Sequence, residues 1–208
     1  MYKRQARYYL QRGWRVLLVD DRAHGGSEGS FVGFGTLDCG DLLQWLRYGA
    51  LRFGRGCPMV LHGVSMGAAA VLMTAGMDGL PAGVKAIVAD CGFTNAWEEF
   101  RHVLRQRTHL PTGFSLRIAD RWARRYAGYG LREGDAPRSL RHAQVPVLFI
   151  HGAADDFVPV WMTEQNYEAC ASFKMKYICP GAGHAESWAR DPAAYARVLD
   201  DFFGQVLA

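Results

Sequence analysis

The chain contains 208 residues, half of them apolar, with a formal net charge of +4, so we expect a single domain, 1–208, around one sizeable core. No apolar run reaches the roughly 18 residues of a membrane span, and the arginine-rich start lacks the apolar core of a signal peptide, which predicts a cytoplasmic protein. Five cysteines without a C-x-x-C pair argue against a disulfide framework or a structural zinc site, and no binding motif supports a nucleic-acid partner.

Hydrophobic patterning predicts short buried strands that alternate with helices. In chain order we expect a helix at 2–12, a strand at 14–19, a glycine-rich loop, a helix at 36–48, a strand at 58–62, a helix from 68, a strand at 84–89, a strand at 145–150, a helix at 161–172, a strand at 174–179 and a helix at 192–205. Alternation of this kind predicts an α/β fold with a mostly parallel sheet that has helices on both faces.

A G-x-S-x-G motif at 63–67 lies where the strand at 58–62 turns into a helix. This context is typical of a nucleophile elbow, in which a tight turn exposes the hydroxyl of Ser65. The turn strains the serine backbone, and we expect Gly63 and Gly67 to leave room for the strand and helix to pack. The backbone N–H of Met66, at the helix N-terminus, would point at an oxyanion formed beside Ser65.

A serine nucleophile needs a histidine base and a carboxylate that orients it, in the chain order Ser, acid, His. Asp155 follows the predicted strand at 145–150, and His184 lies in a glycine-containing loop between the predicted strand at 174–179 and the last helix. Ends of parallel strands meet at one edge of the sheet. The sequence therefore predicts that Ser65, Asp155 and His184 come together.

Two other aspartates are candidates for the acid. Asp156 adjoins Asp155 and would replace it if the loop had a different register. Asp90 ends the predicted strand at 84–89, where its alternative role is to cap the following turn. Asp155 is favoured over both.

The remaining histidines with an assignable place have structural interpretations. His62 lies inside the strand before the elbow, where a hydrogen-bonded core histidine is expected. His24 and His151 belong to loop motifs. His184 differs from them, because a histidine between the last strand and the last helix has no packing reason to be there.

These segments resemble the α/β-hydrolase superfamily, and more narrowly the bacterial serine hydrolases related to the S33 serine-aminopeptidase and lysophospholipase-like group. The matching motifs are D-x-R-x-H-G-x-S-x-G, G-x-S-x-G, H-G-x-x-D-x-x-V-P and G-x-G-H, at 20–29, 63–67, 151–159 and 181–184. They follow the family order and span nearly the whole chain. The resemblance implies Ser65 as nucleophile, Asp155 as acid and His184 as general base, with no metal or organic cofactor.

Between 95 and 144 the strand pattern stops and apolar residues recur at helical spacing, at the point where the superfamily carries its cap. We interpret 95–144 as a helical cap insertion with an apolar underside, and expect substrate choice to lie there. Its ten arginines are Arg101, Arg105, Arg107, Arg117, Arg121, Arg124, Arg125, Arg132, Arg138 and Arg141. This charge indicates either contact with a membrane surface or anionic amphiphiles, or a solvated face.

We therefore expect a serine hydrolase that cleaves an ester, or an amide or thioester, of a small-molecule acyl substrate through an acyl-enzyme. Carboxylesterase or lipase-like action is favoured over S33-type peptidase action because esters are intrinsically easier to cleave.

One alternative is a non-catalytic or crippled scaffold. In the superfamily a second oxyanion donor comes from a loop after a strand that precedes the first helix of this chain, and the segment at 14–19 corresponds to the family's fourth strand. We therefore expect an N-terminally truncated form of the fold. In it, the strand at 14–19 either is unpaired or lies directly beside the elbow strand, and Gly25 or Gly26 substitutes as donor.

Overall fold

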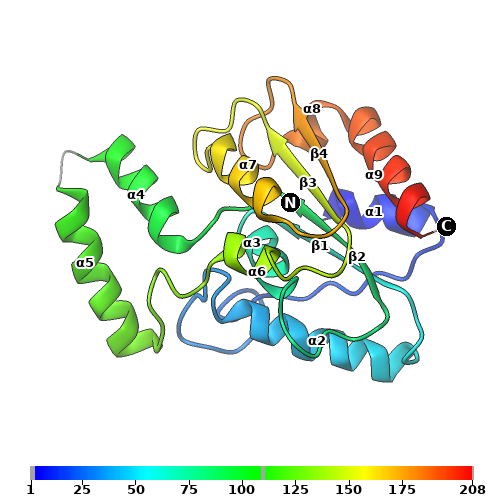
Figure 1. Cartoon of the computed structure of the whole chain (residues 1–208), viewed down its shortest axis with the longest axis horizontal. Helices are drawn as coiled ribbons and strands as arrows, with labels where there is room; N and C mark the ends of the chain where they lie inside the picture. Colours follow the sequence, from blue (N-terminus) through cyan, green and yellow to red (C-terminus); the bar gives the residue numbers. More distant parts are fainter. Residues whose placement is uncertain (1–2, 109–110, 208) are drawn as a thin grey trace.

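The computed structural model describes residues 3–108 and 111–207, and its centre is a four-stranded parallel β-sheet (Figure 1). The strands are β1 (Met59–Val64), β2 (Val84–Asp90), β3 (Val147–Gly152) and β4 (Lys174–Cys179), and their order in the sheet is their order in the chain. Val64 pairs with Asp90, and Asp90 pairs with Ile150. The carboxyl ends of β1 and β2 therefore lie level at one edge of the sheet, and β3 ends two residues further on.

Helices cover both faces of the sheet, as the sequence predicts (Figure 1). Their bounds are α1 (Lys3–Gln11), α2 (Asp38–Phe53), α3 (Met66–Thr74), α6 (Ala136–Leu140), α7 (Val160–Ala169), α8 (Ser187–Arg190) and α9 (Pro192–Val206). Side chains of β2 alternate between two cores: Ile87 packs with α2, α3, α6 and α7, whereas Val88 packs with α1 and α9. This alternation is the period of a strand that is buried on both faces.

The predicted strand at 14–19 is wrong. Residues 14–20 form neither strand nor helix, and the edge strand β1 pairs only with β2 among the described residues. Trp14 and Val16 still pack against the α1–α9 core, but Leu17 and Leu18 are 48% and 54% exposed. An apolar segment becomes a strand only when a neighbour supplies backbone partners, and none lies beside this one.

The region 95–144 is helical, as its spacing predicts, with α4 (Ala96–Arg107), α5 (Thr112–Trp122), a π-helical turn η1 (Ala123–Ala127) and α6. The Asn95 side chain accepts a hydrogen bond from the backbone N–H of Glu98 at 2.9 Å and so caps α4. A small third core, which includes Trp97 and Leu116, joins α4 to α5. Both helices extend away from the sheet at the side where its strands end (Figure 1).

The expectation of an apolar underside is met only in part. Trp97 and Leu116 are buried, at 7% and 1% exposed, but the largest apolar side chains of α5 and η1 face solvent. These are Phe114, Ile118, Trp122 and Tyr126. Helical periodicity predicts that such residues share a face, but not which face the protein covers.

Candidate active site

The turn between β1 and α3 consists of Ser65 alone. Its backbone has φ 56° and ψ −114°, a strained conformation for an L-residue, and its N–H donates to the carbonyl of Asp90 at 2.8 Å. A Cβ on Gly63 would lie 2.2 Å from the carbonyl oxygen of Gly67, so this position requires glycine. A Cβ on Gly67 would meet nothing within 4 Å outside its own helix. The expectation that both glycines make room is therefore correct for Gly63 only.

The structure brings the three predicted site residues into one hydrogen-bonded row. Ser65 Oγ lies 2.8 Å from His184 Nε2, and His184 Nδ1 lies 2.8 Å from Asp155 Oδ2. With the proton on Nδ1 donated to the carboxylate, Nε2 presents its lone pair to the serine hydroxyl. Such a row can take a proton from Ser65 as it attacks a carbonyl carbon.

Asp155 is held by donors on several sides although its side chain is fully buried. His184 and His151, the latter 3.2 Å away, approach Oδ2, while the backbone N–H groups of Phe157 and Val158 donate to Oδ1. Burial alone would raise the pKa of Asp155, but the hydrogen bonds from His151 and His184 outweigh it and hold that pKa well below its usual value. The carboxylate therefore stays ionised.

Neither alternative aspartate touches His184 in the structure. Asp156 is exposed, and its backbone carbonyl accepts a hydrogen bond from His102 Nε2 at 3.0 Å. Asp90 is 1% exposed and accepts from the Tyr195 hydroxyl at 2.9 Å, and burial raises its pKa to about 6.

Of the other histidines, His62 and His151 are buried as a structural interpretation requires, although His151 lies in β3 and not in a loop. His62 lies between the hydroxyls of Tyr9 and Tyr195, at 2.8 and 3.1 Å, and burial lowers its pKa to about 4. It is therefore a neutral, hydrogen-bonded core histidine. The ring of His151 is buried between Thr163 Oγ1 and the Val158 carbonyl, whereas His24 is exposed.

Cys91, which the sequence gives no reason to select, lies where the three segments of the site meet. Its side chain is fully buried, and the backbone carbonyl of the residue before it, Asp90, accepts the hydrogen bond from the Ser65 N–H at 2.8 Å. The side-chain ligand atoms of Cys91, Asp155 and His184 all lie within 4.8 Å of one another. Burial raises the pKa of this thiol well above its usual value, so it is neutral. Ser65, Cys91 and Ala185 all have positive φ, between 50° and 56°.

The same three side chains are the described residues that could hold a metal ion. A borderline-soft ion would find sulfur, nitrogen and oxygen donors there. An ion that took Nδ1 of His184 would replace the hydrogen bond to Asp155, so metal binding and the serine–histidine–aspartate row are competing uses of this site.

One backbone donor for an oxyanion can be assigned by its position. Met66 is the first residue of α3, so its N–H has no intrahelical acceptor and lies directly beside Ser65. Of the two glycines expected to substitute as second donor, Gly25 and Gly26, the latter is already engaged, because its N–H donates to the Asp20 carboxylate at 3.0 Å.

Glu99 is a buried acid that the sequence pattern does not reveal. It lies in the first turn of α4, is 4% exposed, and neither carboxyl oxygen has a hydrogen-bond partner among the described residues. Burial, reinforced by the negative charge of Asp155, raises its pKa to about 8. A helix pattern with two adjacent glutamates gives no signal that one of them turns inward.

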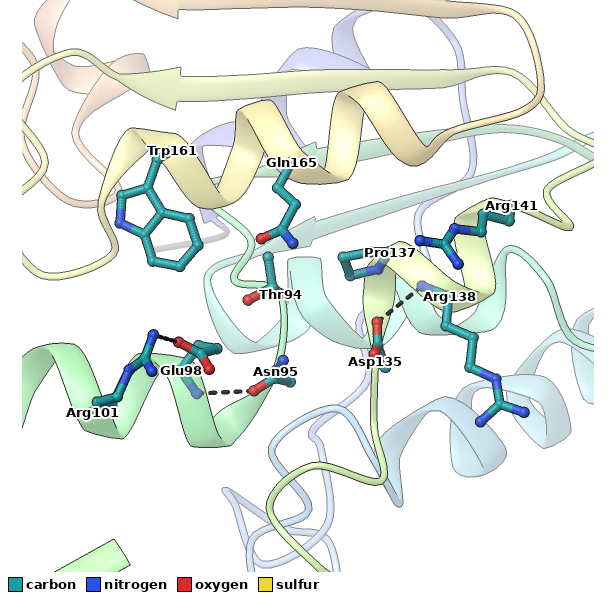
Figure 2. Close-up of a pocket in the computed structure, with 10 residues that line it drawn as sticks. All are labelled: Thr94, Asn95, Glu98, Arg101, Asp135, Pro137, Arg138, Arg141, Trp161 and Gln165. Carbon is teal, nitrogen blue, oxygen red and sulfur yellow. Dashed lines mark hydrogen bonds and ion pairs between the residues drawn. The ribbon is translucent and has the colours of Figure 1, made fainter. Parts of the chain in front are cut away.

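An open groove of about 550 Å³ runs between α4, α6 and α7 (Figure 2). Its lining is mostly polar and contains none of Ser65, Asp155 and His184. The lining residues are Thr94, Asn95, Glu98, Arg101, Asp135, Pro137, Arg138, Arg141, Trp161 and Gln165. Several of these side chains are engaged with one another, since Glu98 pairs with Arg101 and Asp135 accepts from the N–H of Arg138 at 2.9 Å (Figure 2). The groove is thus separate from the row around Ser65.

Comparison with known proteins is consistent with this architecture. A model of the alpha/beta hydrolase family matches residues 3–198. The uncharacterized protein YqkD of Bacillus subtilis is 32% identical over 194 residues, which cover 93% of this chain and 63% of that protein. The chain thus spans less than two thirds of the length of this relative.

Solved structures with the same fold include proteins described as esterases. The esterase Pf2001 of Pyrococcus furiosus superposes with a TM-score of 0.72 at 17% identity, covering 99% of this chain and 76% of that one. A lipase-esterase related protein of Clostridium acetobutylicum gives 0.66 at 17% identity, with 97% and 88% coverage. No helix among residues 3–108 and 111–207 is long and apolar enough to cross a membrane.

Replacing Glu99 with Gln should make stability less dependent on pH. Because the folded-state pKa is raised from 4.5 to about 8, the folded wild type loses stability relative to the unfolded chain as the pH rises between these values. We expect the Tm of Glu99→Gln to equal that of the wild type near pH 4.5 and to exceed it above about pH 8. The difference should be about 2–4 °C for each kcal/mol of stability that the wild type has lost. Thermal melts over this pH range, with the exposed Glu168→Gln as control, test this; an offset that is constant with pH would contradict it.

Cys91→Ala should slow turnover without weakening substrate binding. Removing the sulfur leaves a gap between the segments that carry Ser65 and His184, and small displacements of reacting groups cost roughly 10- to 100-fold in rate. We expect kcat for a p-nitrophenyl ester to fall by about this factor with KM unchanged, and Cys91→Ser to recover most of it. The buried Cys170→Ala serves as the matched control. Equal losses in Cys91→Ala and Cys170→Ala would contradict a positioning role.

Proposed function

Because this chain belongs to the α/β-hydrolase family, we propose that it is a serine hydrolase that cleaves carboxylic esters of small molecules through an acyl-enzyme. The observation that carries the proposal is the unbroken row of hydrogen bonds from Ser65 Oγ through the His184 ring to Asp155, with 2.8 Å at each step. The distances match those expected between a nucleophile, its base and the group that orients the base.

In this mechanism His184 takes the proton from Ser65 as the oxygen attacks the ester carbonyl. Asp155, kept ionised by its buried hydrogen bonds, fixes the tautomer of His184 and stabilises the imidazolium that forms. His184 then protonates the leaving alcohol, and water hydrolyses the acyl-enzyme by the same route in reverse. The Met66 N–H at the start of α3 stabilises the oxyanion, assisted by the positive end of the helix dipole.

An ester is the proposed substrate because the chemistry is easier than amide cleavage, and the structural relatives described above as esterases agree with this choice. Peptidase action of the S33 type is the second candidate.

The helical region 95–144 is proposed to act as a cap over this site. Support comes from α4, which reaches the loop that carries Asp155: His102 binds the backbone of Asp156, and the guanidinium of Arg107 lies 5.7 Å from the Phe157 ring centre. Phe157 in turn packs against His184, with ring centres 4.9 Å apart. A substrate bound at Ser65 would therefore meet α4.

The competing function is a scaffold with little activity. Met66 is the only backbone oxyanion donor that can be assigned among the described residues, and losing one such donor typically costs about 2.7–4 kcal/mol of transition-state stabilisation. The two candidates differ in whether Ser65 is reactive.

A fluorophosphonate probe separates these candidates. We expect the wild type to be labelled covalently and to hydrolyse a short p-nitrophenyl ester, because His184 activates Ser65. Ser65→Ala and His184→Ala should each lose at least about 10⁴-fold in kcat while keeping the wild-type circular dichroism spectrum. A folded wild type that takes up no label would establish the scaffold instead.

The two adjacent aspartates provide a matched pair. Asp155→Asn should lower kcat by about 10⁴-fold, because the buried amide no longer fixes the His184 tautomer. Asp156→Asn should change it less than about threefold, since that side chain is exposed. Steady-state kinetics of both variants test the assignment, and the reverse ranking would transfer the acid role to Asp156.

A further inference from the structure

The outer face of α5 and η1 carries an unusual amount of exposed apolar surface. Phe114, Ile118, Trp122 and Tyr126 are 67%, 45%, 61% and 60% exposed. They recur every fourth residue, so on a helix they form one continuous stripe. The opposite face is the one that packs on the protein, because Leu116 is 1% exposed and belongs to the core shared with α4.

A row of arginines runs beside this apolar stripe. Arg117, Arg121 and Arg125 also recur every fourth residue, and all three are exposed. None of them forms an ion pair with any residue in 3–108 or 111–207. The one acid in α5 and η1, Asp120, forms an ion pair with Arg124 at 3.0 Å. The exposed face is therefore both apolar and positively charged.

Helix α5 is also placed where such a face can meet a flat partner. It lies at the outer end of the region 95–144, with α4 between it and the body of the protein (Figure 1). Large exposed apolar patches on soluble domains mark sites of interaction.

We propose that the stripe of Phe114, Ile118, Trp122 and Tyr126, with the arginine row beside it, docks on an anionic lipid–water interface. The apolar rings would enter the boundary between headgroups and acyl chains, where Trp and Tyr are favoured, and the guanidinium groups would pair with lipid phosphates. A partner protein with a neutral apolar groove would leave three arginines uncompensated. The charge therefore selects an anionic surface over such a groove.

Vesicle flotation in the absence of substrate tests the proposal independently of catalysis. We expect the wild-type chain to float with phosphatidylcholine vesicles that contain phosphatidylglycerol, to bind pure phosphatidylcholine much less, and to dissociate progressively as NaCl is added. Failure to bind the anionic vesicles would overturn the proposal, whatever the result of the fluorophosphonate experiment.

Two sets of substitutions separate the charge from the stripe. Arg117→Gln/Arg121→Gln/Arg125→Gln should lower the vesicle partition coefficient by about fivefold for each arginine removed, roughly a hundredfold in all. The control with equal charge loss at exposed sites elsewhere is Arg4→Gln/Arg7→Gln/Arg141→Gln. Equal losses in both triple variants would show a non-specific charge effect and overturn the proposal.

A second pair of variants tests the apolar stripe. Phe114→Ser/Trp122→Ser should abolish flotation while keeping the wild-type circular dichroism spectrum, whereas Trp45→Ser/Leu51→Ser, which removes exposed apolar residues from α2, should still float. Light scattering without lipid tests whether a second copy of the chain covers the stripe instead. A wild-type dimer that becomes monomeric in Phe114→Ser/Trp122→Ser would assign the stripe to a second copy and overturn the lipid proposal.

Discussion

The arrangement around Ser65 depends on one buried charge, the carboxylate of Asp155. A buried carboxylate is stable only where donors replace the water it has lost. Here two of the donors are the N–H groups of Phe157 and Val158 in its own loop, and two are the rings of His151 and His184. The first pair folds the loop after β3 around the carboxylate, and His184 ties the loop after β4 to it, while His151 lies in β3 itself. Without that charge, neither loop would have a reason to take its observed shape.

A second constraint comes from the level ends of β1 and β2. The chain turns sharply after β1 and β2, where Ser65 and Cys91 adopt positive φ, and Ala185 does so in the loop after β4, at a typical cost of about 1–3 kcal/mol each. The packing of the surrounding sheet and helices holds these residues in their strained conformations. The Cys91 sulfur lies within 4.8 Å of the nearest ligand atoms of Asp155 and His184, so the strained turns and the hydrogen-bonded row belong to the same small region.

Sequence patterns predict most of this structure where local and tertiary signals agree. Strands β1 to β3 are largely apolar runs and β4 is a half-buried segment with two lysines; all four pair in the sheet, and Ser65, Asp155 and His184 follow from strand ends and a fixed chain order. The segment 14–20 fails because strand formation needs a neighbour that no local pattern can supply. Glu99 and Cys91 escape notice because inward orientation depends on how α4 and the strand-end turns pack. The exposure of Phe114 has the same origin, since spacing defines a stripe but not its environment.

The contacts between the first and last helices have a consequence for synthesis of the chain. The Tyr8 hydroxyl donates to Asp200 at 2.6 Å, and Arg12 forms an ion pair with the same carboxylate at 2.7 Å, across 192 and 188 positions of sequence. A helix of nine residues is marginal in water by itself. During synthesis, α1 therefore lacks its contacts with Asp200 until α9 has emerged. Helix α1 is therefore made long before α9, and docking of α9 completes the core that the two helices share.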